Sequence, residues 1–205
     1  MAKTKIREIL NSEDTTKEKI DYLWGYYHWH VVIAVIVVSL LAFITVDAFN
    51  RTETTFHVTV FAAEVSFLEE EALINDLNDL LEPESEKESA YVSFTPQGRM
   101  VEGFLARLAA AEYDLILMDN EAYEQYSELG AMLEFRLTGL PEEDYYQPDG
   151  HDDPIGIDSS QLPIFDGYET TKDTIVMIPE NTRRRETVKD FFETQGYEIE
   201  FIDQD

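Results

Sequence analysis

The polar residues best suited to bind a ligand follow three apolar segments of the chain. Each segment has the pattern of a β-strand, and hydroxyl, amide or carboxylate groups come soon after or at its end: Glu64, Ser66, Thr95, Gln97, Asp119 and Asn120. Ligands of open parallel sheets bind beyond the carboxyl ends of the strands, so these six are the candidate ligand-binding residues. Hydroxyl and amide groups there could hold an anion, whereas Glu64 and Asp119 would favour an amine. Helix capping by Ser66 and Asp119 is the competing interpretation.

An acidic loop offers a candidate metal site. His151 lies among Asp149, Asp152 and Asp153, and carboxylate oxygens with one imidazole could bind a divalent cation. The spacing does not match an EF-hand, and a solvated acidic loop is the competing interpretation. Asp149, His151 and Asp153 are the candidate ligands.

Catalytic patterns are absent from the sequence. The chain has no cysteine, which excludes disulfides, thiolate catalysis and cysteine-ligated zinc. It also has no Ser/His/Asp set, paired-His motif or phosphate loop, so we expect neither enzymatic activity nor a cofactor. A net charge of -28 excludes nucleic acid as a partner, because that partner requires a basic face. The basic cluster 183–185 should begin a helix with its charge in solvent, or dock on anionic headgroups or on an acidic patch of a partner.

The elements that would position these residues alternate between strand and helix. Strands are expected at 56–62, 91–95 and 114–118, and each is followed by a helix; the first helix has Ser66 and Glu69 as a capping box. Three such repeats predict a three-layer α/β domain with a mostly parallel sheet, in which 115–117 is a central strand buried on both faces.

The later chain is less regular. A short strand is expected at 132–135, and residues 137–172 form an acidic, loop-rich insertion that holds four of the seven prolines. Within it, 154–157 and 162–165 could pair as strands. A strand at 174–178, a helix at 184–195 and a strand at 197–202 complete the predicted domain.

The order of these segments resembles the first lobe of a type 2 solute-binding protein. The resemblance lies in HVTVFAAE, AYVSFTPQGRMVEGFLARLAAAEYDLILMD, NEAYEQYSELGAMLEF and TIVMIPENTRRRETVKDFFET, and covers roughly 56–136 and 173–195. It implies an α/β lobe, and in that family a second lobe closes over the ligand. The second lobe would stand at 137–172, but thirty-six residues with four prolines cannot build one. A small-molecule ligand is therefore not expected.

One long apolar run near the start predicts a membrane span. Residues 31–46 carry no charge, and the stretch from Tyr26 to Phe49 covers about 36 Å as a helix, enough to cross a bilayer. Trp24 to Trp29 is typical of an interfacial aromatic belt. Five Lys and Arg precede the span, whereas the forty residues after it contain Arg51 and Lys87 only, which places the N-terminus in the cytoplasm.

The expected organisation is a cytoplasmic tail (1–25), a signal-anchor helix in the lipid bilayer (26–49), a linker (50–55) and an extracellular domain (56–205). Cleavage near Ala48 is the rival interpretation of the anchor. The expected function is that of a non-catalytic binding or accessory module of a bacterial cell membrane, acting with a partner such as a transporter. The alternative is a solute receptor or sensor that binds a ligand at the strand ends.

Overall fold

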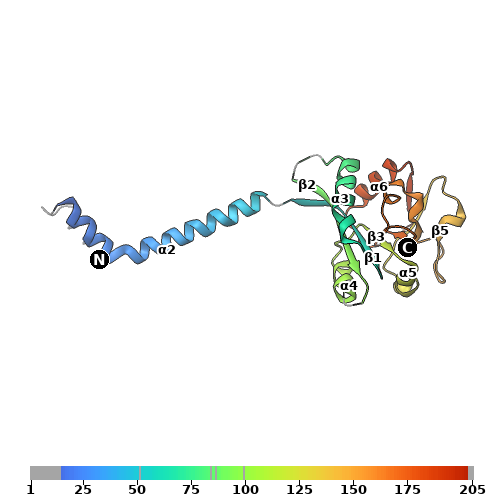
Figure 1. The fold of residues 1–205 in the computed structure, drawn as a ribbon, viewed down its shortest axis with the longest axis horizontal. Helices are drawn as coiled ribbons and strands as arrows, with labels where there is room; N and C mark the ends of the chain where they lie inside the picture. Colours follow the sequence, from blue (N-terminus) through green and yellow to red (C-terminus); the bar gives the residue numbers. More distant parts are fainter. Residues whose placement is uncertain (1–14, 51, 84, 86, 99, 203–205) are drawn as a thin grey trace. The chain divides into compact units, whose positions relative to one another are not determined.

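A long helix precedes the α/β domain. The computed structural model describes residues 15–50, 52–83, 85, 87–98 and 100–202. Helix α2 covers Thr16–Asn50 (Figure 1). Its segment Tyr27–Val46 is long and apolar enough to cross a membrane, and its most apolar stretch is not buried inside the protein. This segment lies within the predicted span (26–49), and it is the single such segment among the described residues. The N-terminal apolar helix could therefore anchor the protein in a membrane. The rest of the chain, Thr52–Asp205, forms a separate unit.

The main sheet of this unit has six strands in the order β2, β1, β3, β7, β6, β5. Its first half contains the predicted strands: β1 (Glu53–Ala62), β2 (Glu88–Pro96) and β3 (Leu115–Met118). These are parallel to one another, with α3 (Phe67–Leu81) and α4 (Val101–Ala109) in the connections. All four residues of β3 are buried, as expected for a central strand made of a continuous apolar run.

The second half of the sheet is antiparallel. β7 (Ile175–Met177) runs antiparallel to β3, and β6 (Gly156–Asp158) and β5 (Tyr145–Tyr146) continue in alternating directions. Parallel neighbours need a crossover connection, usually a helix. Between β6 and β7 the chain has only the short 3-10 helices η3 (Ser159–Gln161) and η4 (Pro163–Phe165). The sheet is therefore mixed. The strand expected at 174–178 is present as β7, but the sequence pattern did not predict its antiparallel direction.

The stretch 137–172 is part of the sheet and the core. It supplies β5 and β6, and its apolar side chains are buried, among them Leu140, Ile155, Ile157, Leu162 and Phe165. The expected pairing at 154–157 overlaps β6. Residues 162–165 do not form the second expected strand, because Pro163 cannot donate to a strand ladder and instead begins η4. The acidic, loop-rich insertion is therefore integrated into the main sheet and its core.

Helices cover both faces of the sheet, which gives the predicted three layers (Figure 1). α3 and α6 (Arg185–Thr194) lie on one face, where Phe56 of β1 stacks on Phe191 with ring centroids 5.1 Å apart. α4 and α5 (Asn120–Tyr126) lie on the other, where Phe61 of β1 stacks on Phe104 at 4.2 Å. The alternation of β1 side chains thus fills two separate cores.

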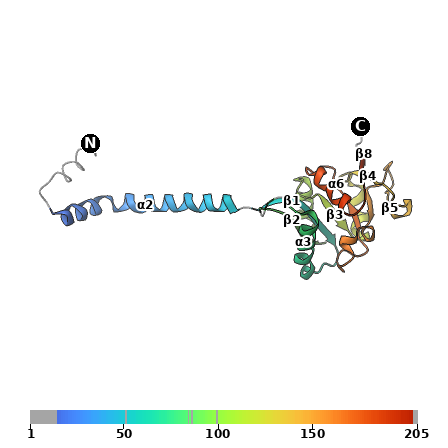
Figure 2. The same cartoon turned by 90° about the horizontal axis from the view of Figure 1, so that it is seen from above.

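A small second sheet stands beside α6. β4 (Glu134–Leu137) pairs antiparallel with β8 (Ile199–Ile202), outside the main sheet (Figure 2). These are the strands expected at 132–135 and 197–202, with shifted bounds. The 3-10 helix η1 (Ser127–Leu129) precedes β4 and ends at Gly130, which has a left-handed φ of 65°. A further 3-10 helix, η2 (Glu142–Asp144), follows β4.

Candidate functional site

Asp119 is the centre of the predicted site at the strand ends. One carboxylate oxygen accepts from the Ala63 N–H at 2.6 Å, and the other accepts from the Ala122 N–H at 2.8 Å and Gln97 Nε2 at 2.9 Å. The bond to Ala122 caps α5, as the capping interpretation predicts. Gln97 and Asp119 therefore lie together in the structure. Their polar groups, however, are engaged in hydrogen bonds that join three segments of the chain.

The other predicted strand-end residues do not converge on one point. Thr95 is buried within the sheet, with its hydroxyl 3.5 Å from that of Thr59. The Ser66 N–H donates to the Thr170 hydroxyl at 3.0 Å. Glu64 and Asn120 are exposed. These positions hold the domain together or face solvent, and they do not enclose a ligand.

The predicted capping box at α3 is replaced by a long-range contact. The Ser66 side chain makes no capping bond. The carboxylate of Glu69 instead accepts from the Thr170 N–H at 3.0 Å and the Thr170 hydroxyl at 2.6 Å. These hydrogen bonds lower the pKa of Glu69, and the bond from the Thr170 hydroxyl has the largest effect. The contact fixes the chain before β7 to the start of α3.

The predicted metal ligands are separated by ion pairs. Asp153 accepts from Arg136 Nε at 2.9 Å, while His151 Nδ1 lies 2.8 Å from Glu134 Oε1. Asp149 is exposed. Across the described ranges, no group of three His, Asp or Glu side chains is arranged to hold a metal ion. The cation site at Asp149, His151 and Asp153 stays a prediction, and in the structure Arg136 and Glu134 engage two of its three side chains.

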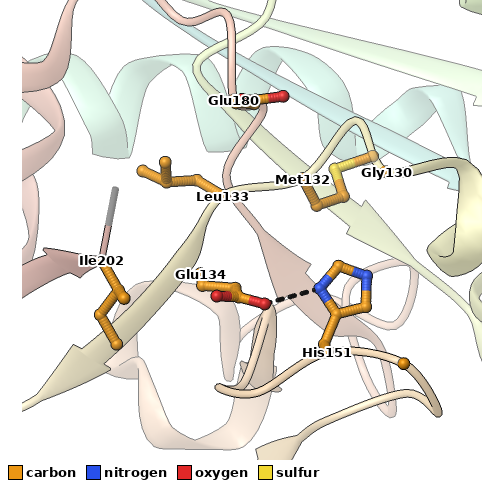
Figure 3. A pocket seen from close by; sticks show the side chains of 8 residues that line it. Gly130, Met132, Leu133, Glu134, His151, Glu180 and Ile202 are labelled. Atoms are coloured by element: carbon orange, nitrogen blue, oxygen red, sulfur yellow. Dashed lines mark hydrogen bonds and ion pairs between the residues drawn. The ribbon is translucent and has the colours of Figure 1, made fainter. Parts of the chain in front are cut away.

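The pair of Glu134 and His151 forms one wall of a cavity of about 210 Å³ (Figure 3). Glu134 is on β4 and is 4% exposed, and the His151 side chain is 11% exposed. Figure 3 shows the Nδ1 edge of the ring facing Glu134 and the second ring nitrogen directed away from it. The rest of the lining consists of Gly130, Met132, Leu133, Gly150, Glu180 and Ile202.

This arrangement can accept a proton but offers little else. A histidine oriented by a carboxylate is a common general base. No hydroxyl, thiol or amine side chain is among the residues lining the cavity, so the pair has no nucleophile to activate there. The cavity is also smaller than the roughly 300 Å³ at which small-molecule sites begin. The pair is best explained as a buried contact that fixes the acidic loop to β4.

Sequence reasoning named His151 but missed Glu134. The available signal was a single acid in an otherwise apolar segment, Met132-Leu-Glu-Phe135. A buried carboxylate requires a partner, so this position predicts a contact with a distant donor. Comparisons of the chain with protein-family models, curated proteins and solved structures found no match.

Proposed function

We propose that this protein is a single-pass, membrane-anchored binding or accessory module of the bacterial cell membrane, with its domain on the extracellular side. It has no catalytic role and acts with a partner membrane protein such as a transporter. The observation that carries the proposal is the unburied apolar segment Tyr27–Val46, joined to a unit with its own cores. A helix so uniformly apolar is stable only where water is excluded, and the bilayer provides that environment.

The orientation rests on the distribution of basic residues. Residues 1–49 contain five Lys and Arg before the span, and few follow it closely. This bias favours a cytoplasmic N-terminus and therefore supports an extracellular position for Thr52–Asp205. The outer residues, 50–205, carry 37 Asp and Glu against ten Lys and Arg, which suits a domain that stays soluble at a cell surface.

We prefer an accessory role to that of a solute receptor because the polar groups at the strand ends are already hydrogen-bonded within the domain. The polar groups of Asp119 and Gln97 are engaged with each other and with backbone N–H groups. A solute at these ends would have to replace those bonds without a second lobe to cover it. Small-molecule sites normally bury most of their ligand, which favours a protein partner here.

The test is co-purification of a partner from native membranes. The full chain with a C-terminal tag is cross-linked in cells and purified in detergent, beside a variant in which residues 16–50 are replaced by an unrelated transmembrane helix. We expect the same membrane protein to be enriched with both chains, because the domain makes the contact. An unrelated acidic domain on a membrane anchor is the control. The proposal is contradicted if neither chain enriches any membrane protein more than this control does.

A further inference from the structure

A cavity lined by arginine lies near the amino-terminal ends of β1 and β2, whereas the predicted ligand site is at their carboxyl ends. Its volume is about 450 Å³. The first halves of β1 and β2 contribute Thr54, His57 and Tyr91, the end of α4 contributes Arg107, and the turn before α6 contributes Arg183 and Arg184. Three of the ten Lys and Arg residues in 50–205 thus line a single cavity of a strongly acidic domain.

Arg184 is fixed in place by a buried carboxylate. Asp114 is fully buried, and its Oδ2 accepts from Arg184 Nη1 and from the His57 N–H, both at 2.8 Å. Its Oδ1 accepts from the Thr182 hydroxyl at 2.7 Å. Asp114 therefore balances the charge of Arg184 and positions the turn that carries Arg183. The guanidinium has five N–H donors, of which Asp114 receives one.

His57 forms a neutral wall of the cavity. Its Nδ1 donates to the Glu112 carbonyl at 3.0 Å, and its Nε2 lies 3.0 Å from the Ser93 hydroxyl oxygen. Burial, with the positive charges of Arg184 and Arg107, lowers the pKa of His57 to about 4. The ring is therefore uncharged at neutral pH and does not offset the arginines.

Two positive charges of the cavity are poorly compensated. Arg183 is exposed and makes no hydrogen bond or ion pair within the part of the chain that the structure describes. Among the described residues, the acidic partner of Arg107 is Glu112, at 3.8 Å, with both side chains 51% exposed, and such surface pairs contribute little. Arg183 and Arg184 also precede the first turn of α6, where the helix dipole disfavours cations. An anion in the cavity would offset all of these repulsions.

We propose that this cavity binds a phosphate-type oxyanion, with Arg107 and Arg183 as its main ligands and Arg184 as a fixed third donor. Guanidinium groups match the oxygens of such an anion with paired, charge-assisted hydrogen bonds. The anion is either free phosphate or the headgroup of a phospholipid. Because α2 is proposed to anchor the chain in a bilayer, phospholipid headgroups are one source.

The test measures thermal unfolding of the full chain in maltoside micelles near neutral pH. Inorganic phosphate is titrated against chloride at constant ionic strength. We expect a saturable rise in Tm for the natural chain, because a ligand that binds only the folded state stabilises it. Arg107→Gln and Arg183→Gln should each weaken the apparent affinity by about tenfold, equivalent to about 1.4 kcal/mol.

The matched control is Lys189→Gln, which removes the same charge from α6 outside the cavity and should leave the phosphate response unchanged. Arg183 is exposed and has no hydrogen bond or ion pair with the described residues, so its variant is expected to fold. The absence of a saturable rise, or an equal rise in the natural chain and all three variants, would overturn the proposal.

A second arm separates the two sources of the anion in nanodiscs that contain phosphatidylglycerol. If a headgroup occupies the cavity, the natural chain has a higher Tm than Arg183→Gln without added phosphate. Added phosphate then raises the Tm no further. If free phosphate is the ligand, the phosphate response persists in the discs. Both results support the proposed chemistry.

Discussion

The carboxylate of Asp119 joins the end of β1, the turn after β2 and the start of α5 through three accepted hydrogen bonds. Asp119→Ala removes the cap of α5 and leaves the Ala63 N–H without this acceptor. We expect a loss of about 2 kcal/mol in the free energy of unfolding, measured by urea denaturation in detergent. The neighbouring Asn120→Ala, at an exposed position, should change stability by less than about 0.5 kcal/mol. Equal effects of the two changes would refute the role given to Asp119.

His57 should make the stability of the domain depend on pH. Its pKa is lowered from 6.5 to about 4 in the folded state, mainly by burial. The unfolded chain therefore binds the proton more readily, so this contribution to stability is complete above pH 6.5 and is lost as the pH falls toward 4. The loss amounts to about 3 kcal/mol at most.

The measurement compares the natural chain with His57→Gln over that pH range. Carboxylates titrate in both proteins, so only the difference between the two pH profiles reports on His57. We expect the natural chain to lose more stability than the variant between the two pKa values. Parallel profiles would show that the histidine is not buried in its neutral form.

At the scale of helices and strands, only part of the fold can be predicted from the local sequence pattern. The apolar run of β3 and the three strand–helix repeats specify the parallel half of the sheet, because periodicity and burial are encoded within each segment. The direction of β7 is not encoded in this way. It depends on the path of the chain through β5 and β6, and an apolar segment of three residues has the same pattern in either direction.

The candidate site was less predictable than the fold, because its contacts are distant in sequence. The cap by Asp119 acts over three residues and was predicted, whereas Glu69 binds Thr170, which is 101 residues away. The pair of Glu134 and His151 and the cluster around Asp114 also join separate elements. Local spacing identifies residues able to make such bonds but does not select their partners.

The contact between β6 and β7 should be sensitive to a single methyl group. A Cβ at Gly156 would lie 2.7 Å from Cγ2 of Ile175 and 3.2 Å from Cγ of Met177. Gly156→Ala should therefore lower the free energy of unfolding by about 1–3 kcal/mol through overpacking, measured by denaturant unfolding. Gly167→Ala is the matched control, because a Cβ there has no neighbour within 4 Å. A neutral result at Gly156 would mean that β6 pairs less closely with β7 than described.

Charge is divided unequally along the whole molecule, and that division predicts its topology. Protease added to intact protoplasts should remove a C-terminal tag and leave a membrane fragment that keeps an N-terminal tag, because the basic residues before the span hold that end in the cytoplasm. Immunoblotting with both tags gives the measurement, and lysed protoplasts show that each tag is cleavable. Replacing Lys17 and Lys19 with Glu should yield a mixture of orientations, whereas the same change at Lys172 and Lys189, far beyond the span, should have no effect. A C-terminal tag that survives in intact protoplasts and is lost only after lysis would place the acidic domain inside the cell and refute its proposed extracellular role.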